Sequence, residues 1–339
     1  MGVSLGFMIR FDTIHITPEI LSLIAGIDEF KGVWRALGIL APDRLSVLHR
    51  AAIIESIGAS TRMGGSKLSD REVERLLSHP QTSSFANSDE QQVASCAAVM
   101  KLVFVSWRDI ALTENHIRQL HRNLLRYSEQ DAWHRGCYKT SANSAAAFEM
   151  PRQMAELVAW FQRERDAGCW HPLLLIGLFI VALLEIHPFE EGNGRLSHVL
   201  TTLLLLQAGY AYVPYGALER VIEQDKEAYC LALRQTQDTM RSEISDWQPW
   251  LVFFLRSMAE QVRRLNERIE HEKQALATLP ALSLRIVEFT REYGRITIGE
   301  AVKLTGASRN TLKLHFRALA ENSYLQRQGN GRGVWYNLK

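Results

Sequence analysis

Apolar residues recur at three- and four-residue intervals along most of the chain, a spacing that predicts α-helices rather than strands. The most apolar stretch runs from Pro172 to Leu184 and predicts a buried helix, because it is shorter than the roughly 20 residues that a membrane span requires. Ser69 and Glu72 form a capping-box pattern that predicts the start of another helix. Residues 1–280 are therefore predicted to form one all-helical domain, with further helices over 45–57, 90–106, 114–126, 151–166, 195–208, 225–240 and 247–275.

The pattern changes near Leu279-Pro280. Three short helical segments are followed by two segments in which apolar and polar residues alternate, as is typical of strands. Three helices and a hairpin predict a small winged helix-turn-helix domain over residues 281–339. The helices are predicted over 282–292, up to Gly306, and over 309–321 with Ser308 as the cap, and the strands over 324–327 and 334–338, separated by Gly329 to Gly333.

This C-terminal segment is basic, although the chain as a whole carries a net charge of only +2. Residues 282–339 hold ten Lys or Arg and four Asp or Glu. The excess predicts an anionic partner, and duplex DNA is the candidate for residues 308–333. Docking onto protein targets and homodimerisation are the alternatives. The residues expected to contact DNA are Arg309, Asn310, Lys313 and Arg317 on the third helix and Arg327 and Arg332 on the hairpin.

The composition fits a globular protein with a full core, because 47% of the residues are hydrophobic and 22% are charged. The four cysteines are widely spaced and form no C-x-x-C pair, which argues against a disulfide framework or a structural zinc site. The N-terminal residues lack the regions of a signal peptide. We therefore expect a cytoplasmic protein that does not enter a membrane.

One segment, His187 to Arg195, combines several groups suited to phosphoryl chemistry. His187 follows a buried helix, so its ring can stay neutral and accept a proton near physiological pH. The glycines at 192 and 194 permit the backbone angles of an anion nest, and the helix that follows directs free amides to the same point. Glu191 offers an oxygen ligand for Mg²⁺, and Arg195 offers a forked phosphate donor. A core histidine beside a tight turn is the alternative interpretation of any one of these features.

The segment resembles the signature of Fic-domain proteins, H-x-F-x-[D/E]-G-N-G-R-x-x-R, from His187 through Arg195. The resemblance extends over roughly residues 40–275 and implies an all-α fold, a Fic-type helical bundle with a flap hairpin. It also implies a transferase, most often a protein adenylyltransferase that moves AMP from ATP to a Ser, Thr or Tyr hydroxyl with Mg²⁺ and releases pyrophosphate.

By position, the resemblance assigns each residue of this segment a role. It implies that His187 deprotonates the target hydroxyl, that Phe189 anchors the loop, and that Glu191 binds Mg²⁺. It also implies that phosphate oxygens are held by Gly192, Asn193 (through its side chain), Gly194 and Arg195.

Two further segments resemble parts of the same family. Residues 135–144 resemble its flap, a hairpin that binds the target by strand addition, and a plain surface loop is the alternative. The target-binding residues of this flap would be Tyr138, Lys139 and Thr140. The segment 225–229 resembles the helix that lines the adenine side, with Tyr229 as the stacking residue and a half-buried core tyrosine as the alternative.

The chain departs from the family pattern at two positions. Relatives with an N-terminal inhibitory helix carry [S/T]-x-x-x-E-[G/N], and here the helix of about 45–65 has Ser60 and Gly65 but Gly64 in place of the glutamate. The last signature position is His198 instead of the arginine that pairs with that glutamate. We therefore expect no autoinhibition of this kind, and a histidine that is charged only part of the time near pH 7. A glycine at position 64 is compatible with a natural or an engineered sequence.

Three functions are consistent with this sequence. The first is an active protein adenylyltransferase, which His187, Glu191, Asn193 and Arg195 favour. The second is a DNA-binding regulator whose Fic-like domain binds a nucleotide without turnover, which His198 favours. The third is a scaffold that keeps only the fold. His198 also leaves a different donor open, such as UTP or CDP-choline.

Overall fold

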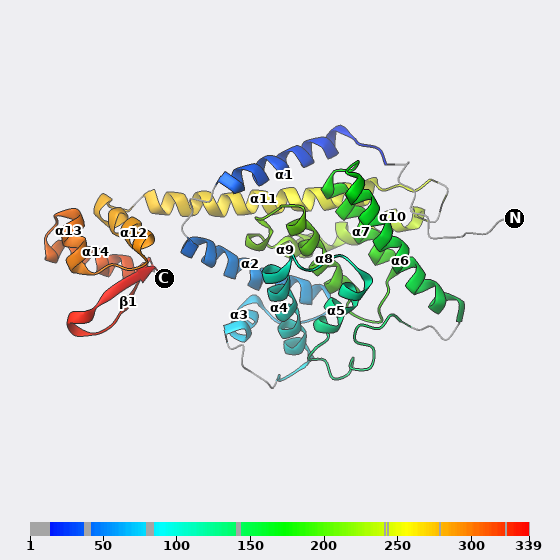
Figure 1. Ribbon diagram of the computed structural model, residues 1–339, viewed down its shortest axis with the longest axis horizontal. Helices are drawn as coiled ribbons and strands as arrows, with labels where there is room; N and C mark the ends of the chain where they lie inside the picture. The colour runs from blue at the N-terminus through cyan, green and yellow to red at the C-terminus, as the bar shows by residue number, and fades with distance from the viewer. Residues whose placement is uncertain are drawn as a thin grey trace. The chain divides into compact units, whose positions relative to one another are not determined.

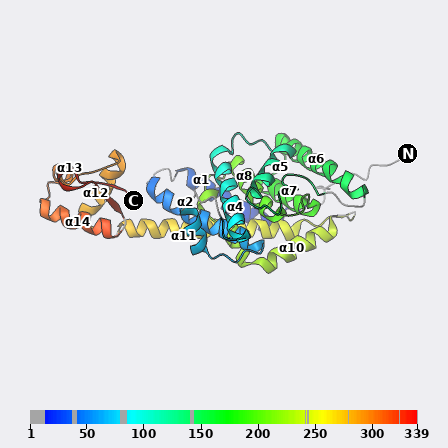
Figure 2. The ribbon, with the colours of Figure 1, turned by 90° about the horizontal axis from the view of Figure 1, so that it is seen from below.

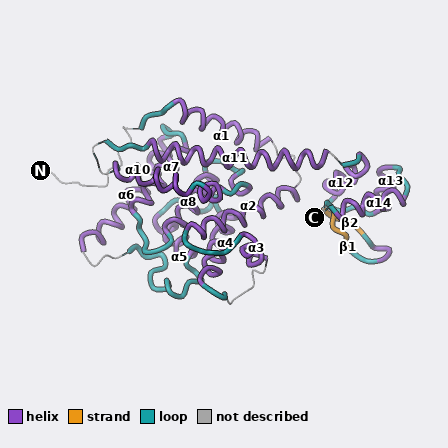
Figure 3. Tube along the Cα trace, turned by 180° about the vertical axis from the view of Figure 1, so that it is seen from behind, coloured by secondary structure: helices purple, strands orange, loops and turns teal. Residues whose placement is uncertain are grey.

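The computed structural model describes residues 14–36, 42–78, 85–139, 144–240, 242, 244–277, 279–322 and 324–338. The chain divides into two compact units, residues 1–38 with 48–263 and residues 39–47 with 264–339. The predicted domain limits, 1–280 and 281–339, stay predictions. Figure 3 shows that, over the described part of the chain, helices make up nearly all of the regular structure and the strands lie near the C-terminus. The prediction of an all-helical fold with a C-terminal hairpin is confirmed.

The first unit is built around two buried helices, α7 (Pro172–Ile186) and α8 (Asn193–Gln207). Helix α7 packs against α6, α8 and α10, and α8 packs against α4 and α5 (Figure 1). Figure 2 shows α10 alongside the first part of α11, and Tyr229 of α10 contacts the rings of Trp250 and Phe253 of α11. The other helices with residues in this unit are α1 (Pro18–Ala36), α2 (Pro42–Met63), α3 (Asp70–Ser78), α4 (Ser88–Ser106), α5 (Glu114–Leu124), α6 (Ser144–Ala167), α9 (Leu218–Gln224), α10 (Lys226–Thr239) and α11 (Gln248–Ala277).

Local sequence signals explain where several of these helices begin. The predicted capping box starts α3, because the Ser69 amide donates to Glu72 Oε2 over 2.8 Å and the Glu72 amide donates to Ser69 Oγ over 3.4 Å. Helix α7 begins with Pro172 in its first turn, as predicted. Within the described residues, no helix is both long enough and apolar enough to span a bilayer.

The helices differ from the prediction in three places. Helices α1 and α9 were not predicted, although Ile20, Ile27 and Phe30 give α1 a buried face. Helix α6 begins at Ser144 instead of 151, so Pro151 lies inside the helix. A proline inside a helix lacks the amide that an interior position would use, so this helix carries a proline where sequence rules disfavour one.

The second unit contains three complete short helices and a hairpin, together with the beginning of α2 and the end of α11. Its complete helices are α12 (Ala281–Tyr293), α13 (Ile298–Thr305) and α14 (Arg309–Glu321), and Ser308 caps α14 as predicted. Strands β1 (Leu325–Gln328) and β2 (Trp335–Leu338) pair antiparallel, with Leu325 opposite Leu338. The core of this unit includes Ile286, Ile296, Phe316, Leu325 and Tyr336. The order of elements is the one predicted, and their assignment as a winged helix stays a prediction.

Candidate active site

The loop from His187 to Arg195, called here the signature loop, joins the two buried helices of the first unit. His187 ends α7 in the left-handed conformation (φ 49°, ψ 60°), and its amide donates to the carbonyl of Leu183 over 3.0 Å. Among the described residues it is the only non-glycine residue with a positive φ. Such a conformation costs roughly 1–3 kcal/mol and persists only where its surroundings fix it. The side chain of His187 is thus presented by a rigid junction.

Gly192 lets the loop turn into α8. It takes φ 81° as the residue before the first turn of the helix, a conformation that favours glycine. A Cβ there would also lie 3.5 Å from His121 Nε2. The free amides of this helix start, including that of Gly194, form the positive end of the helix dipole. This geometry fits an anion site at the start of α8.

Asn193 stabilises the loop from inside. Its Oδ1 accepts from the Phe189 amide over 3.0 Å, and its Nδ2 donates to the Phe189 carbonyl over 2.7 Å. The same Nδ2 lies 3.3 Å from His187 Nδ1. The side chain is buried and holds the shape of the loop. Its expected contact with a phosphate oxygen stays a prediction.

Arg195 lies in the first turn of α8 and brings a positive charge to the start of this helix. Its guanidinium is buried, and its Nη1 has no hydrogen-bond partner among the described residues. A buried unpaired charge-bearing donor is costly in a folded protein. A phosphate oxygen would supply the missing acceptor.

His198 does not replace the missing arginine. Its ring is buried, and Nδ1 lies 2.9 Å from Ser60 Oγ of α2. Burial lowers the pKa of His198 to about 4, so the expectation of a partly charged ring near pH 7 is wrong. His198 and Ser60 form a neutral contact between α2 and α8.

The signature loop borders a cavity of about 340 Å³. The cavity brings together most of the predicted site residues, and Gly65, Tyr138 and Lys139 are not among the residues lining it. Predicted residues that line it are Ser60, Gly64, His187, Glu191, Gly192, Asn193, Gly194, Arg195, His198 and Tyr229. Sequence reasoning missed four others, Met63, Glu190, Lys226 and Cys230.

The end of α2 forms one wall of this cavity. A Cβ on Gly64 would lie 4.0 Å from Arg195 Nε, so position 64 faces the guanidinium of the signature loop. Gly65 takes φ 103° two residues after the end of the helix, and the Ser66 amide donates to the Thr61 carbonyl over 3.1 Å. The predicted inhibitory-motif positions are therefore next to the cavity, without a carboxylate at position 64.

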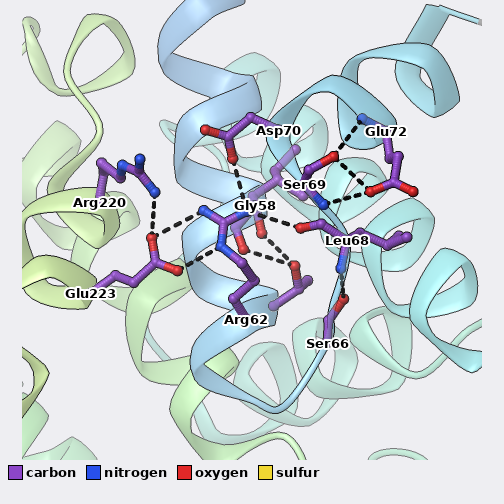
Figure 4. A network of polar contacts seen from close by, with 11 residues as sticks. Gly58, Arg62, Ser66, Leu68, Ser69, Asp70, Glu72, Arg220 and Glu223 are labelled. Carbon is purple, nitrogen blue, oxygen red and sulfur yellow. Dashed lines mark hydrogen bonds and ion pairs between the residues drawn. The ribbon is translucent and has the colours of Figure 1, made fainter.

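Arg62 fastens this end of α2 to two other helices. Figure 4 shows its guanidinium between Glu223 of α9 and Asp70 of α3, at 2.6 Å and 2.8 Å. Arg220 also donates to Glu223, over 2.8 Å. The hydrogen bond from Arg62 is the main reason that the pKa of Glu223 is lowered. This partly buried network keeps Ser60 and Gly64 at the cavity.

Of the three predicted flap residues, the structure describes two. Tyr138 donates from its hydroxyl to Glu114 Oε2 over 3.1 Å, and the Lys139 amide donates to the Pro188 carbonyl over 2.9 Å. Thr140 lies outside the described residues. Residues 137–139 form no strand, so the described part of this segment does not show the predicted hairpin. It does attach directly to the signature loop.

Tyr229 lies between the core and the cavity, and its expected role as the stacking residue for adenine stays a prediction. It lines the cavity, and its ring packs edge-on against Trp250 and Phe253, with centroids 5.7 Å and 5.8 Å away. Burial is the main reason that the pKa of its hydroxyl rises to about 12. A ring held in this way offers a fixed surface for a planar base.

The site can hold a neutral base next to an anion. Partial loss of hydration, and then the nearby charge of Lys139, lower the pKa of His187, so its imidazole is neutral at pH 7. Among the described residues, no group of three or more His, Cys, Asp or Glu side chains could hold a metal ion alone. Mg²⁺ usually keeps several water ligands and binds phosphate oxygens together with one or two carboxylates. Glu191, exposed at the rim of the cavity, is suited to be one of them.

Comparison with known proteins shows what this region is similar to. Residues 111–205 match the model of the Fic/DOC family. A protein adenylyltransferase Fic from Aedes aegypti is 26% identical over 172 residues, which cover 48% of this chain and 34% of the relative. A protein adenylyltransferase and cysteine protease, IbpA, from Histophilus somni is 38% identical over 69 residues, which cover 19% of this chain and 2% of the relative. The chain thus matches about a third or less of the length of these relatives.

Two solved structures share the fold. A Fic family protein from Desulfovibrio desulfuricans superposes with a TM-score of 0.64 at 21% identity, covering 96% of this chain and 98% of that one. A Fic domain containing signaling protein from Bacteroides thetaiotaomicron gives a TM-score of 0.61 at 25% identity, covering 73% and 98%. These similarities confirm a mostly helical Fic fold for the chain.

Proposed function

We propose that this chain is a protein adenylyltransferase that transfers AMP from ATP to a Ser, Thr or Tyr hydroxyl. The match of residues 111–205 to the Fic/DOC family model supports this proposal. The observation that carries the proposal is the arrangement at the cavity. A neutral His187, held in a strained conformation, borders the same space as the buried, unpaired guanidinium of Arg195 and the start of α8. The similarity to protein adenylyltransferases also supports the proposal.

The proposed reaction uses His187 as the general base. The hydroxyl of the target gives its proton to the imidazole while its oxygen attacks the α-phosphorus of ATP. The bond to the β-phosphate bridging oxygen breaks, and pyrophosphate leaves. The amides at the start of α8 and the guanidinium of Arg195 stabilise the phosphate oxygens. The ring of Tyr229 stacks on the adenine of ATP. A magnesium ion held by Glu191 would supply positive charge to the phosphate oxygens.

The identity of the nucleotide donor is less well specified here than in the family signature, because one phosphate-binding arginine is missing. His198 is neutral and bonded to Ser60, so the γ-phosphate lacks the fixed cation that a signature arginine would give. Lys226 also lines the cavity and adds one positive charge there. ATP is the donor that we propose, and UTP and CDP-choline are the alternatives to be compared with it.

The experiment that tests this function is incubation of the chain with ATP and Mg²⁺, alone and with a cell extract, followed by intact-mass measurement. A mass gain of one AMP on the chain or on an extract protein supports transfer. Nucleotide that is bound at equilibrium, with no covalent product under any condition, supports a nucleotide sensor and contradicts the transferase. UTP and CDP-choline in parallel reactions identify the donor.

The charged surface of the second unit favours a second function, binding of duplex DNA. Helix α14 exposes Arg309, Asn310, Lys313 and Arg317, and β1 exposes Arg327. Arg317 is partly neutralised by Glu321 at 2.8 Å. The side chain of Arg332 lies outside those that the structure describes. A basic helix beside a basic hairpin would direct these groups to a DNA groove and its phosphates.

A further inference from the structure

One face of α5 holds the start of the predicted flap. Glu114, Arg118 and His121 lie four and three residues apart, so a helix places them on the same side. Each contacts the segment 136–138. Glu114 accepts from the Tyr138 hydroxyl, Arg118 Nε donates to the Gly136 carbonyl over 2.7 Å, and His121 Nδ1 accepts from the Gly136 amide over 3.0 Å.

The backbone at Gly136 fits closely against this face. Gly136 takes φ 71°, and a Cβ there would lie 2.7 Å from the Arg118 carbonyl oxygen. Any side chain would have to displace backbone, so the contact depends on glycine. The start of the flap is thus fixed to α5 at backbone level.

His121 continues from this contact to the signature loop. Its Nε2 lies 2.8 Å from the Glu191 carbonyl oxygen. Because the Gly136 amide can only donate, Nδ1 must accept, and the ring hydrogen is therefore on Nε2 and is donated to Glu191. The ring is fully buried and stacks on Phe189, with centroids 3.7 Å apart and planes 10° apart. Burial lowers its pKa to about 4, which keeps the neutral form that both contacts require.

We propose that His121 is a positioning residue that couples the flap to the anion-binding loop, because one neutral imidazole bonds Gly136 on one side and Glu191 on the other. This inference rests on the proposed function for its kinetic consequence. A change at the flap reaches the backbone of Glu191 through a single rigid ring, and a nucleotide on the loop stabilises the flap through the same ring. Such coupling is reciprocal.

Two variants separate the two bonds. In His121→Asn the amide reaches about as far as Nδ1, so it can accept from Gly136 but cannot reach Glu191. In His121→Gln the amide reaches about as far as Nε2, so it can donate to Glu191 but leaves Gly136 without its acceptor. His116→Asn and His116→Gln are matched controls on the same helix, because the ring of His116 forms hydrogen bonds with the cap residue Thr113 and the Ala111 carbonyl and with no residue of the flap or the signature loop among those described.

The first readout is hydrogen–deuterium exchange of the peptides that cover 134–139 and 188–195, with and without Mg²⁺ and a non-hydrolysable ATP analogue. In the wild type, the analogue is expected to slow exchange in both peptides. In His121→Asn the 134–139 peptide stays protected but no longer responds to the analogue, and binding of the analogue weakens about tenfold. In His121→Gln the 134–139 peptide exchanges faster from the start, and analogue affinity stays near wild type.

The second readout is kinetic. His121→Gln is expected to raise the KM for the target about tenfold and to change the KM for ATP little. His121→Asn is expected to raise the KM for ATP about tenfold and to change the KM for the target little. The coupling would be overturned if the two variants had equal effects on both peptides and on both KM values. It would also be overturned if the variants lowered only the Tm. A wild-type chain that transfers no AMP but shows the exchange pattern would contradict the proposed function and leave the coupling supported.

Discussion

At the residue scale, the account depends on a histidine whose backbone is strained and whose ring is kept neutral. The left-handed conformation of His187 directs the side chain away from the helix that ends there, and Asn193 braces the loop beside it. The local environment then sets the protonation state. A base of this kind works only while its ring is uncharged.

The pH dependence of transfer follows from the lowered pKa of His187. The folded protein loses the neutral base as pH falls through this pKa, which lies below the ordinary value of about 6.5. We therefore expect kcat/KM to stay constant from pH 7.5 to about 6.5 and to fall at lower pH with a slope of one.

Lys139 supplies the test of that assignment. Lys139→Gln removes the charge that contributes to the shift, so the acidic limb of the profile should move to higher pH in this variant. A wild-type midpoint above pH 7, or a profile that Lys139→Gln leaves in place or moves to lower pH, would contradict the assignment of the base.

At the scale of single elements, the C-terminal end of α2 forms one wall of the cavity with Ser60, Met63 and Gly64. Arg62 fixes it to α3 and α9, while Ser60 contacts His198 and Gly64 faces Arg195. The sequence showed that the inhibitory glutamate and its arginine partner are both absent. It did not show that Arg195 lies close enough to position 64 to pair with a glutamate there in place of the missing arginine.

Gly64→Glu is therefore expected to inhibit transfer, although His198 offers no charge. A carboxylate at position 64 can reach the unpaired Nη1 of Arg195 and compete with phosphate for it. A hydrogen bond between charged groups predicts a loss of roughly 10- to 100-fold in ATP affinity, measured by calorimetry. Gly64→Gln, which has the same length without the charge, is the control and should lose much less. Equal loss in both variants would show that the cavity is blocked by volume instead of charge.

Much of this site could be predicted from the sequence, and the rest depended on contacts between distant segments. The signature loop is contiguous, so its glycines, His187 and Glu191 were recognisable together. His121 is a single histidine 66 residues before His187 in the chain, and nothing near it indicates that it touches Glu191. The neutral state of His198 was likewise hidden, because burial sets it and the sequence shows only an ionisable residue.

The helices illustrate the same limit. The spacing of apolar residues predicted most of them, and the signal for α1 was present in Pro18, Ile20, Ile27 and Phe30. The flap could be recognised only by resemblance. Its described residues are positioned by side chains of α5 and by the Pro188 carbonyl, which no local pattern encodes.

At the scale of the whole molecule, the chain joins a mostly helical unit with a Fic fold to a small basic unit. The second unit has its own core around Phe316 and presents its charges on α14 and β1. Because the two units are separate compact bodies, the charge of the second can be tested while the cavity of the first is unchanged.

Duplex DNA should bind the second unit with a strong dependence on salt. Each phosphate contact adds about 0.9 to the slope of log affinity against log salt concentration. Arg309→Ala and Lys313→Ala should each lower that slope by about one, whereas Lys101→Ala on α4 should not change it. Fluorescence anisotropy at several salt concentrations measures it. Absence of binding at low salt, or a slope that none of the variants changes, would exclude DNA as the partner.

The central claim is tested most directly by the AMP-transfer rate of His187→Ala compared with the wild type, at pH 7.5 and saturating ATP and Mg²⁺. Loss of a positioned general base should lower the rate by about 10²- to 10⁴-fold while the affinity for ATP stays within a few-fold of wild type. His116→Ala should transfer at the wild-type rate. Transfer by His187→Ala at close to the wild-type rate would contradict the account.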